Sequence, residues 1–368
     1  MNKRRHCISF AIHAVAFLVP LAAASGGHDS LLAPVPTEAI IRILDDRGAP
    51  SKAAHPVPFL DLPAHTPCGT FTVDAENALL HAAAYARLSG PERTEHARAA
   101  AAILHAWATD NEGFGGANGW LCAAWNMGSM ARTAYVLKTL QAQEYDEIRH
   151  VFEAWAVQTT QAYLLPRDER LPLPGSRPQL LQHWEREHVS NRTMVGLEAA
   201  LHVARLTGDR TWYRKIVERY REYIQWKRFR APKDEPGAGT TYFVNASGEN
   251  NDHFRGDAWH RTAGLASCLQ ICEMVKADTG EDLFHAEGAI LKQSLEFYAD
   301  TIGPHGGAPI PVWDIAARAF PDSEKIVAMA YRQKAHERAS SIGTILQYSW
   351  GISDLLTLSG NPVNHNVK

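Results

Sequence analysis

Three short segments of the chain collect side chains that transfer protons, bind anions and stack on flat rings. Histidine exchanges protons near neutral pH, asparagine and arginine bind carboxylates, and tryptophan offers a large flat apolar face. The segments are Asn118-Gly119-Trp120, His188-Val189-Ser190-Asn191-Arg192, and the run from Asn250 to His260. Any one of them alone is typical of a helix start, where Ser190 or Asp257 would act as an N-cap. Together, at the same end of a fold, they indicate a functional site.

The candidate residues fall into two groups by chemistry. Those expected to neutralise charge or transfer a proton are Asn191, Tyr242, His188, His253, Arg255 and His260. Those expected to hold the substrate by stacking or hydrogen bonding are Trp120, Asn118, Trp184, Arg192, Trp259 and Arg261. Tyr242 has two open interpretations, a hydroxyl that exchanges protons and an aromatic ring that packs within a loop.

A repeated helical hairpin must position these residues. Three times a helix ends in a Gly-containing turn and a second helix follows, at Gly90, Gly208 and Gly280. Glycine in that place supplies the positive φ of a helix C-terminus. A fourth pair, without the glycine, is expected from 120–140 and 146–163. The apolar residues recur at helical spacing and no sustained strand pattern is found. The chain is therefore expected to be all-α, with sequential antiparallel hairpins that close as an α/α toroid or stack as an open solenoid. The toroid is preferred at this length.

The connections between hairpins are much longer than the turns inside them. They cover 109–119, 164–187 and 227–256, and each leads into one of the three polar segments. In a toroid of hairpins these connections all emerge at one end. Long loops on a rigid scaffold usually carry function, so that end is predicted to hold the site.

The first 24 residues resemble a secretory signal peptide. Lys3, Arg4 and Arg5 precede an apolar run, and small residues at 22–24 offer a cleavage site. We therefore expect residues 25–368 to form one domain, periplasmic or secreted, with no attachment to a membrane after cleavage. Loss of the three cations changes the formal net charge from −3 to −6, which gives no reason to expect nucleic acid as a partner.

The remaining sequence features point to no metal and no cofactor, and we expect neither at the site. Cys68, Cys122, Cys268 and Cys272 allow up to two disulfides. Cys268 and Cys272 share a helix face without zinc-site spacing around them, and are expected to be small core residues. The stretch 113–116 is rich in glycine but lacks the Lys and Ser/Thr of a phosphate loop, so we expect only a flexible loop there.

The polar segments resemble the alginate lyase type of α/α toroid. In that family a short Asn-His segment and a later Arg-Tyr-His segment flank the cleft. The resemblance implies that His188/Asn191 and Arg255, Trp259 and His260 do so here. Two differences, Arg192 after the Asn and Trp259 in the place of a Tyr, make the chain similar to a divergent branch such as the family that includes glucuronan lyases. The resemblance covers about residues 110–300 and implies an anionic polyuronate as substrate.

The resemblance implies cleavage by β-elimination. Asn191, with Arg255 or His188, would neutralise the uronate carboxylate. Tyr242, His253 or His260 would remove the C5 proton and protonate the leaving oxygen. Two alternatives remain open: a glycoside hydrolase that uses Asp257 with Glu249 or Asp252, and a carbohydrate-binding protein without catalysis.

Overall fold

The computed structural model describes residues 36–63, 67–163, 191–224, 244, 258–285, 290–302 and 313–339. This part of the chain is mostly helical. The signal-peptide segment at 1–24 lies outside the described residues, as do most of the long connections between hairpins. Among the described residues, no helix is long and apolar enough to cross a membrane.

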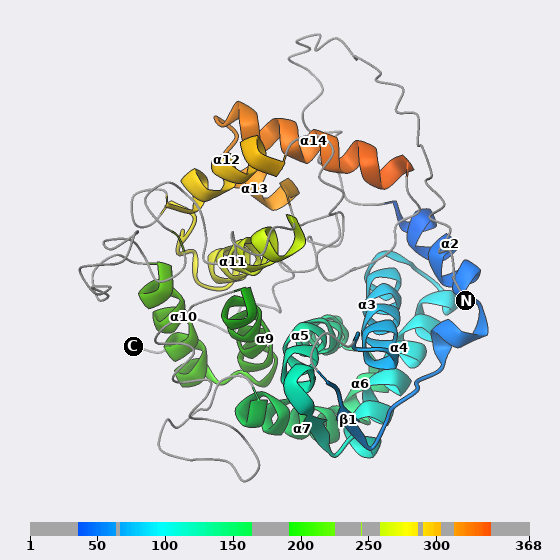
Figure 1. Ribbon diagram of the computed structural model, residues 1–368. Helices are drawn as coiled ribbons and strands as arrows, with labels where there is room; N and C mark the ends of the chain where they lie inside the picture. The colour runs from blue at the N-terminus through cyan, green and yellow to red at the C-terminus, as the bar shows by residue number, and fades with distance from the viewer. Residues whose placement is uncertain are drawn as a thin grey trace, which may run out of the picture.

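The expected hairpins are present (Figure 1). The first consists of α3 (Thr70–Arg87) and α4 (Pro91–Asp110). The second consists of α5 (Gly116–Thr139) and α7 (Arg149–Tyr163), joined through the short α6 (Gln143–Asp146). The third consists of α9 (Asn191–Thr207) and α10 (Arg210–Ile224), and the fourth of α11 (Ala258–Thr279) and α12 (Ile290–Ile302). Figure 1 shows these hairpins following one another around an arc, with α3, α5, α9 and α11 on its inner side. These four are called the inner helices.

The predicted glycine turns have the expected conformation. Gly90, Gly208 and Gly280 have φ of 82°, 72° and 78°, the left-handed region that ends a helix at low steric cost to glycine. After Gly208, the Asp209 carboxylate accepts a hydrogen bond from the backbone N–H of Trp212 at 2.9 Å and caps α10. After Gly280 the second helix begins ten residues later, at Ile290, and not directly after the turn as the sequence pattern suggested.

Further elements lie at the two ends of the described chain. The helix α2 (Thr37–Arg47) packs on α3, and the short 3₁₀ helix η1 (Ala49–Lys52) follows it. Near the C-terminal end, α13 (Trp313–Ala319) and α14 (Glu324–Ala339) pack on each other. The apolar pattern near the C-terminus predicts a last pair of helices, at 323–330 and 335–358, but α14 is continuous between 330 and 335.

One prediction about the fold is corrected by a small sheet. Strand β1 (Phe59–Asp61) pairs in parallel with β2 (Gly113–Gly115), with Leu60 opposite Phe114. The described chain is therefore helical with a two-stranded sheet, and not purely α. Three residues are too few for an alternating pattern to be recognised in sequence. The pairing also joins segments more than fifty positions apart.

A single large apolar cluster joins the inner helices to their outer partners. Its buried members run from Leu60 to Ala330. Many are alanines, such as Ala78 in α3 and Ala100 in α4, whose small side chains let the helix axes approach closely. The core therefore fixes the inner helices relative to one another, and with them the residues at their starts.

Candidate functional site

The first two inner helices run parallel and begin at the same end. A disulfide joins Cys68, just before α3, to Cys122 in the second turn of α5, with a sequence separation of 54. At the other end of the same helices, the Tyr85 hydroxyl donates to the Leu140 carbonyl at 3.0 Å, with a separation of 55. A constant separation means that both helices advance in the same direction.

The contacts between α5 and α9 follow the same rule. Near the helix starts, the Arg192 guanidinium lies 5.6 Å from the centre of the Trp120 ring. In mid-helix, a Cβ at Gly128 would lie 3.7 Å from the His202 ring. At the far end, Lys138 Nζ donates to the Leu206 carbonyl. The residues therefore meet in the same order along both helices, which run parallel.

The pair α9 and α11 is parallel as well. Burial raises the pKa of Cys268, with a smaller contribution from the neighbouring Glu198 of α9. About two turns further along α9, Arg205 Nη2 donates to Asp278 Oδ1 of α11 at 2.6 Å. The starts of α3, α5, α9 and α11 consequently lie at one end of the fold, which we call the N-terminal end of the inner helices. The predicted convergence of the polar segments depends on this parallel order.

Two of the three predicted segments meet there directly. Asn118 is buried in the first turn of α5, and Trp120 is half-buried one residue after Gly119. Asn191, the first residue of α9, is 1% exposed, and Arg192 beside it lies over the Trp120 ring. A cation over an indole face is attracted by the ring quadrupole. This contact joins the starts of α5 and α9.

Of the third polar segment, the structure describes only the backbone at the start of α11. Trp259, His260 and Arg261 occupy the first turn of α11, beside the start of α9, but their side chains are outside the described part. The remaining predicted site residues also lie outside the described residues: Trp184, His188, Tyr242, His253 and Arg255, together with Glu249, Asp252 and Asp257 of the hydrolase alternative.

The glycine-rich stretch before α5 is tightly packed, which corrects the expectation of a flexible loop. Residues 113–115 form β2, and Phe114 is 3% exposed. Gly116 has φ of 72°, and a Cβ there would overlap the Leu62 carbonyl. The Asn118 backbone N–H donates to that same carbonyl at 3.0 Å. The start of α5 is therefore held rigidly against the chain that follows β1.

The electrostatics of this end depend on the first-turn residues of the four inner helices. Helix N-termini carry a partial positive charge and commonly have acidic residues in the first turn. None of the four inner helices has one. The outer helices α7, α10 and α12 also have none, whereas α2, α4 and α14 do. The Asp61 carboxylate lies beside the start of α5, next to Gly115 and Gly116, and the buried Asp74 carboxylate lies in the second turn of α3. Four parallel helix dipoles and Arg192 thus make this end locally favourable for anions.

A buried polar stripe lies below Asn191 and was missed in the sequence. Glu198 and His202 follow Asn191 on the same side of α9, and both are at most 5% exposed. His202 Nε2 lies 3.7 Å from Glu198 Oε1. Burial lowers the pKa of His202, an effect that Glu198 opposes and that Arg132 of α5 reinforces. The sequence did contain a signal for this stripe, because Glu198 and His202 stand seven and eleven positions after Asn191 in an otherwise apolar helix.

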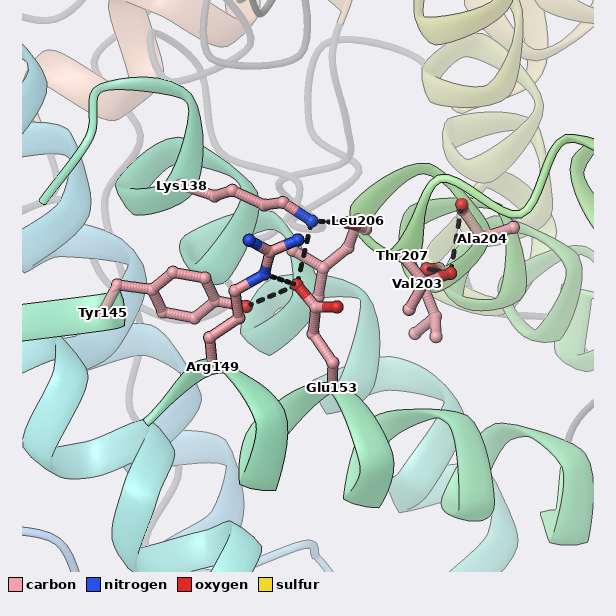
Figure 2. Close-up of polar contacts among 8 residues, drawn as sticks. All are labelled: Lys138, Tyr145, Arg149, Glu153, Val203, Ala204, Leu206 and Thr207. Atoms are coloured by element: carbon pink, nitrogen blue, oxygen red, sulfur yellow. Dashed lines mark hydrogen bonds and ion pairs between the residues drawn. The ribbon is translucent and has the colours of Figure 1, made fainter. Parts of the chain in front are cut away.

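The opposite end of the inner helices has a structural role (Figure 2). Glu153 Oε1 accepts hydrogen bonds from Lys138 Nζ at 2.9 Å, Arg149 Nε at 3.0 Å and the Tyr145 hydroxyl at 3.3 Å. Lys138 also binds the Leu206 carbonyl and so caps the C-terminus of α9. Burial raises the pKa of Tyr145. At this end, side-chain hydrogen bonds and short turns connect the helices α5, α6, α7 and α9.

Two of the four described cysteines form a disulfide, and the other two are free thiols. Cys68 and Cys122 form the disulfide described above. Cys268 and Cys272 are free and fully buried, which confirms the expectation of core residues. The Tyr220 hydroxyl lies 3.1 Å from Cys272 Sγ, and burial raises the pKa of that thiol to about 12.

No group of three or more His, Cys, Asp or Glu side chains in the described ranges is placed to hold a metal ion. No family model matches the chain, and no curated protein matches it.

Proposed function

We propose that this protein is an exported polysaccharide lyase that cleaves a uronate-containing polymer by β-elimination. The observation that carries the proposal is the N-terminal end of the inner helices, where four helix dipoles converge without an acidic residue in any first turn. Arg192, Asn191 and Trp120 meet there. Dipoles and a guanidinium favour a bound carboxylate, and an aromatic ring favours a sugar.

We further propose that the hairpins belong to an α/α toroid of the alginate lyase type. The alternation of inner and outer helices supports this arrangement, because each inner helix packs on the next and on an outer partner. In such a toroid the substrate would cross the N-terminal end of the inner helices. The disulfide agrees with the proposed periplasmic or secreted location, because disulfides persist in oxidising compartments.

The proposed β-elimination removes a proton from C5 and cleaves the C4–O4 bond of the uronate. Asn191, with Arg255 or His188, binds the uronate carboxylate and stabilises the negative charge that develops as the C5–H bond breaks. Tyr242, His253 or His260 takes that proton. The electron pair forms the C4–C5 double bond, the C4–O4 bond breaks, and the departing oxygen receives a proton from one of these residues. Trp120, Trp184 and Trp259 would stack on the sugars, while Asn118, Arg192 and Arg261 would bind their polar groups.

The direct test is incubation of the purified protein with alginate, glucuronan and other uronate polymers. Elimination creates an unsaturated uronate that absorbs in the ultraviolet, so absorbance should rise with time. A hydrolase would release reducing ends without that absorbance, and a binding protein would retain the polymer unchanged. Either result would contradict the proposal and identify the correct alternative.

Substitutions test the residue roles. Asn191→Ala, Tyr242→Phe and His260→Ala should each remove most of the activity while the circular dichroism of the helices stays unchanged. Full activity in all three variants would remove the basis for the assignment.

A further inference from the structure

The β1–β2 pair buries one face and exposes the other. Leu60 and Phe114 lie opposite each other and belong to the apolar core. Successive side chains of a strand point to opposite faces of its sheet, so Phe59 and Asp61 share the face that is turned away from the core. Both side chains are exposed, and for Phe59 the exposed fraction is 54%. The outer face of the sheet thus presents an aromatic ring and a carboxylate to solvent.

Glycines form the floor of this outer face. Phe59 pairs with Gly113 and Asp61 pairs with Gly115, so β2 adds no side chain to it. The Phe59 ring lies against Gly115, since a Cβ there would lie only 2.5 Å from the ring atom Cε1. The same Cβ would lie 3.2 Å from Asp61 Oδ1. The ring edge and the carboxylate are therefore neighbours, and the ring is backed by the glycine backbone on one side and open on another.

This outer face adjoins the end of the inner helices where we propose the active site. A Cβ at Gly119, in the first turn of α5, would lie 3.0 Å from the Leu60 carbonyl. Gly119 directly precedes Trp120 in the chain. The backbone N–H of Asn118 donates to the Leu62 carbonyl at 3.0 Å. Strand β1 therefore runs beside the same turn of α5 that carries two of the proposed substrate-binding residues.

We propose that Phe59 and Asp61 form a subsite for a neutral sugar unit of the substrate. The inference rests on the proposed function and narrows the substrate to a polymer in which neutral sugars accompany uronates. A sugar ring has an apolar C–H face and hydroxyl groups around its rim. It can stack on the Phe59 ring while its hydroxyls donate to the Asp61 carboxylate. Both groups are in place before the sugar binds, which lowers the entropy cost of binding.

The charge of Asp61 decides which kind of sugar fits. A uronate stacked on Phe59 would bring a second carboxylate close to Asp61, and like charges placed together disfavour binding. A neutral sugar offers only hydroxyl donors to the same oxygen atoms. Arg192, at the start of α9, supplies the opposite charge for the uronate unit. The two charges at this end therefore match a polymer that contains both kinds of unit.

Calorimetric titration of the full chain tests the subsite without reference to cleavage. The probes are neutral hexasaccharides from cellulose, mannan and xylan, and an anionic hexasaccharide from glucuronan. The wild type should bind at least one neutral probe, and Phe59→Ala should weaken that binding about tenfold. Phe59→Tyr keeps the ring and should retain the affinity. Val73→Ala, which removes the side chain of an apolar residue of α3 that is 50% exposed, is the matched control and should also retain it.

A substitution of Asp61 separates binding from a structural role. In Asp61→Asn the hydrogen bonds to the sugar lose their charge, so binding of the neutral probe should weaken about fivefold. Binding of the glucuronan probe should become tighter, because the repulsion is removed. A carboxylate that only stabilises the start of α5 would change the binding of both probes in the same direction.

Three results would overturn the proposal. They are no binding of any neutral probe to the wild type, unchanged binding in Phe59→Ala, and parallel changes for both kinds of probe in Asp61→Asn. If Phe59→Ala does not fold, Phe59→Leu, which keeps apolar bulk without a flat ring, takes its place and should also weaken binding. Failure of the proposed lyase activity is a separate outcome, because a protein without elimination activity would still show these binding differences.

Discussion

At the scale of single residues, the contact between Arg192 and Trp120 is the feature that most directly links structure to the proposed chemistry. It joins the first turns of α5 and α9 and holds a guanidinium at the end where the helix dipoles converge. Arginine is suited to this role, since its planar group stacks on aromatic rings and binds carboxylates with its edge. A lysine would supply the charge without that geometry.

Arg192→Gln should raise the KM for an anionic polymer about tenfold or more, because a charge-assisted contact is worth roughly 1.5–3 kcal/mol. The variant should also respond less to added salt than the wild type. Initial rates at several ionic strengths measure both effects. Arg214→Gln, on the outer helix α10, is the control and should leave KM unchanged. Equal KM values in all three proteins would show that Arg192 does not bind the substrate.

At the scale of elements, the entry into α5 shows how the sheet positions the site. The strands are short, but they hold the chain at 113–116 against Leu60 and Leu62. This contact sets where α5 begins, and hence the position of Asn118 and Trp120. A rigid entry suits a site that must hold its groups before the substrate arrives.

Two glycines allow this packing to be measured. Gly116 and Gly208 both have φ of 72°, but a Cβ would overlap the Leu62 carbonyl at Gly116 and meet nothing within 4 Å at Gly208. Gly208→Ala should cost only the backbone strain, about 1 kcal/mol. Gly116→Ala should cost that amount plus the steric conflict, at least about 2 kcal/mol more. Urea unfolding measures the loss of unfolding free energy in both variants. Equal losses would mean that the backbone before α5 shifts to accommodate the added Cβ and is not held rigidly.

Sequence spacing was most informative at this scale. The turns at Gly90 and Gly208 and the helices around them were predicted, because a left-handed residue and an apolar stripe are local properties. The late start of α12 and the continuous α14 were not predicted, since contacts with other elements decide where such segments begin and end.

At the scale of the whole molecule, the overall charge and the site have opposite signs. The expected mature chain carries −6, which would repel a polyanion at long range. The parallel inner helices make one end locally favourable for anions, and a local field can dominate within about 8–10 Å at physiological salt. The sign of the net charge therefore says little about the partner of this site.

The disulfide contributes at the same scale, since it joins the first two hairpins at the end where we propose the site. The double variant Cys68→Ala/Cys122→Ala should lose about 2–4 kcal/mol of unfolding free energy, because the bond closes a long loop in the unfolded chain. Reductant should destabilise the wild type by a similar amount and leave the variant unchanged. Denaturant unfolding with and without reductant makes the comparison, and no effect on either protein would contradict this role.

The sequence by itself determined the helices, most of their turns and the polar residues at the helix starts, because each depends on neighbours within a few positions. Only the tertiary structure decided that Arg192 reaches Trp120 and that Cys68 pairs with Cys122. It also decided that Glu198 and His202 are buried together and that residues 113–115 form a strand. These features join segments distant in the chain or depend on burial between helices, and local spacing specifies neither.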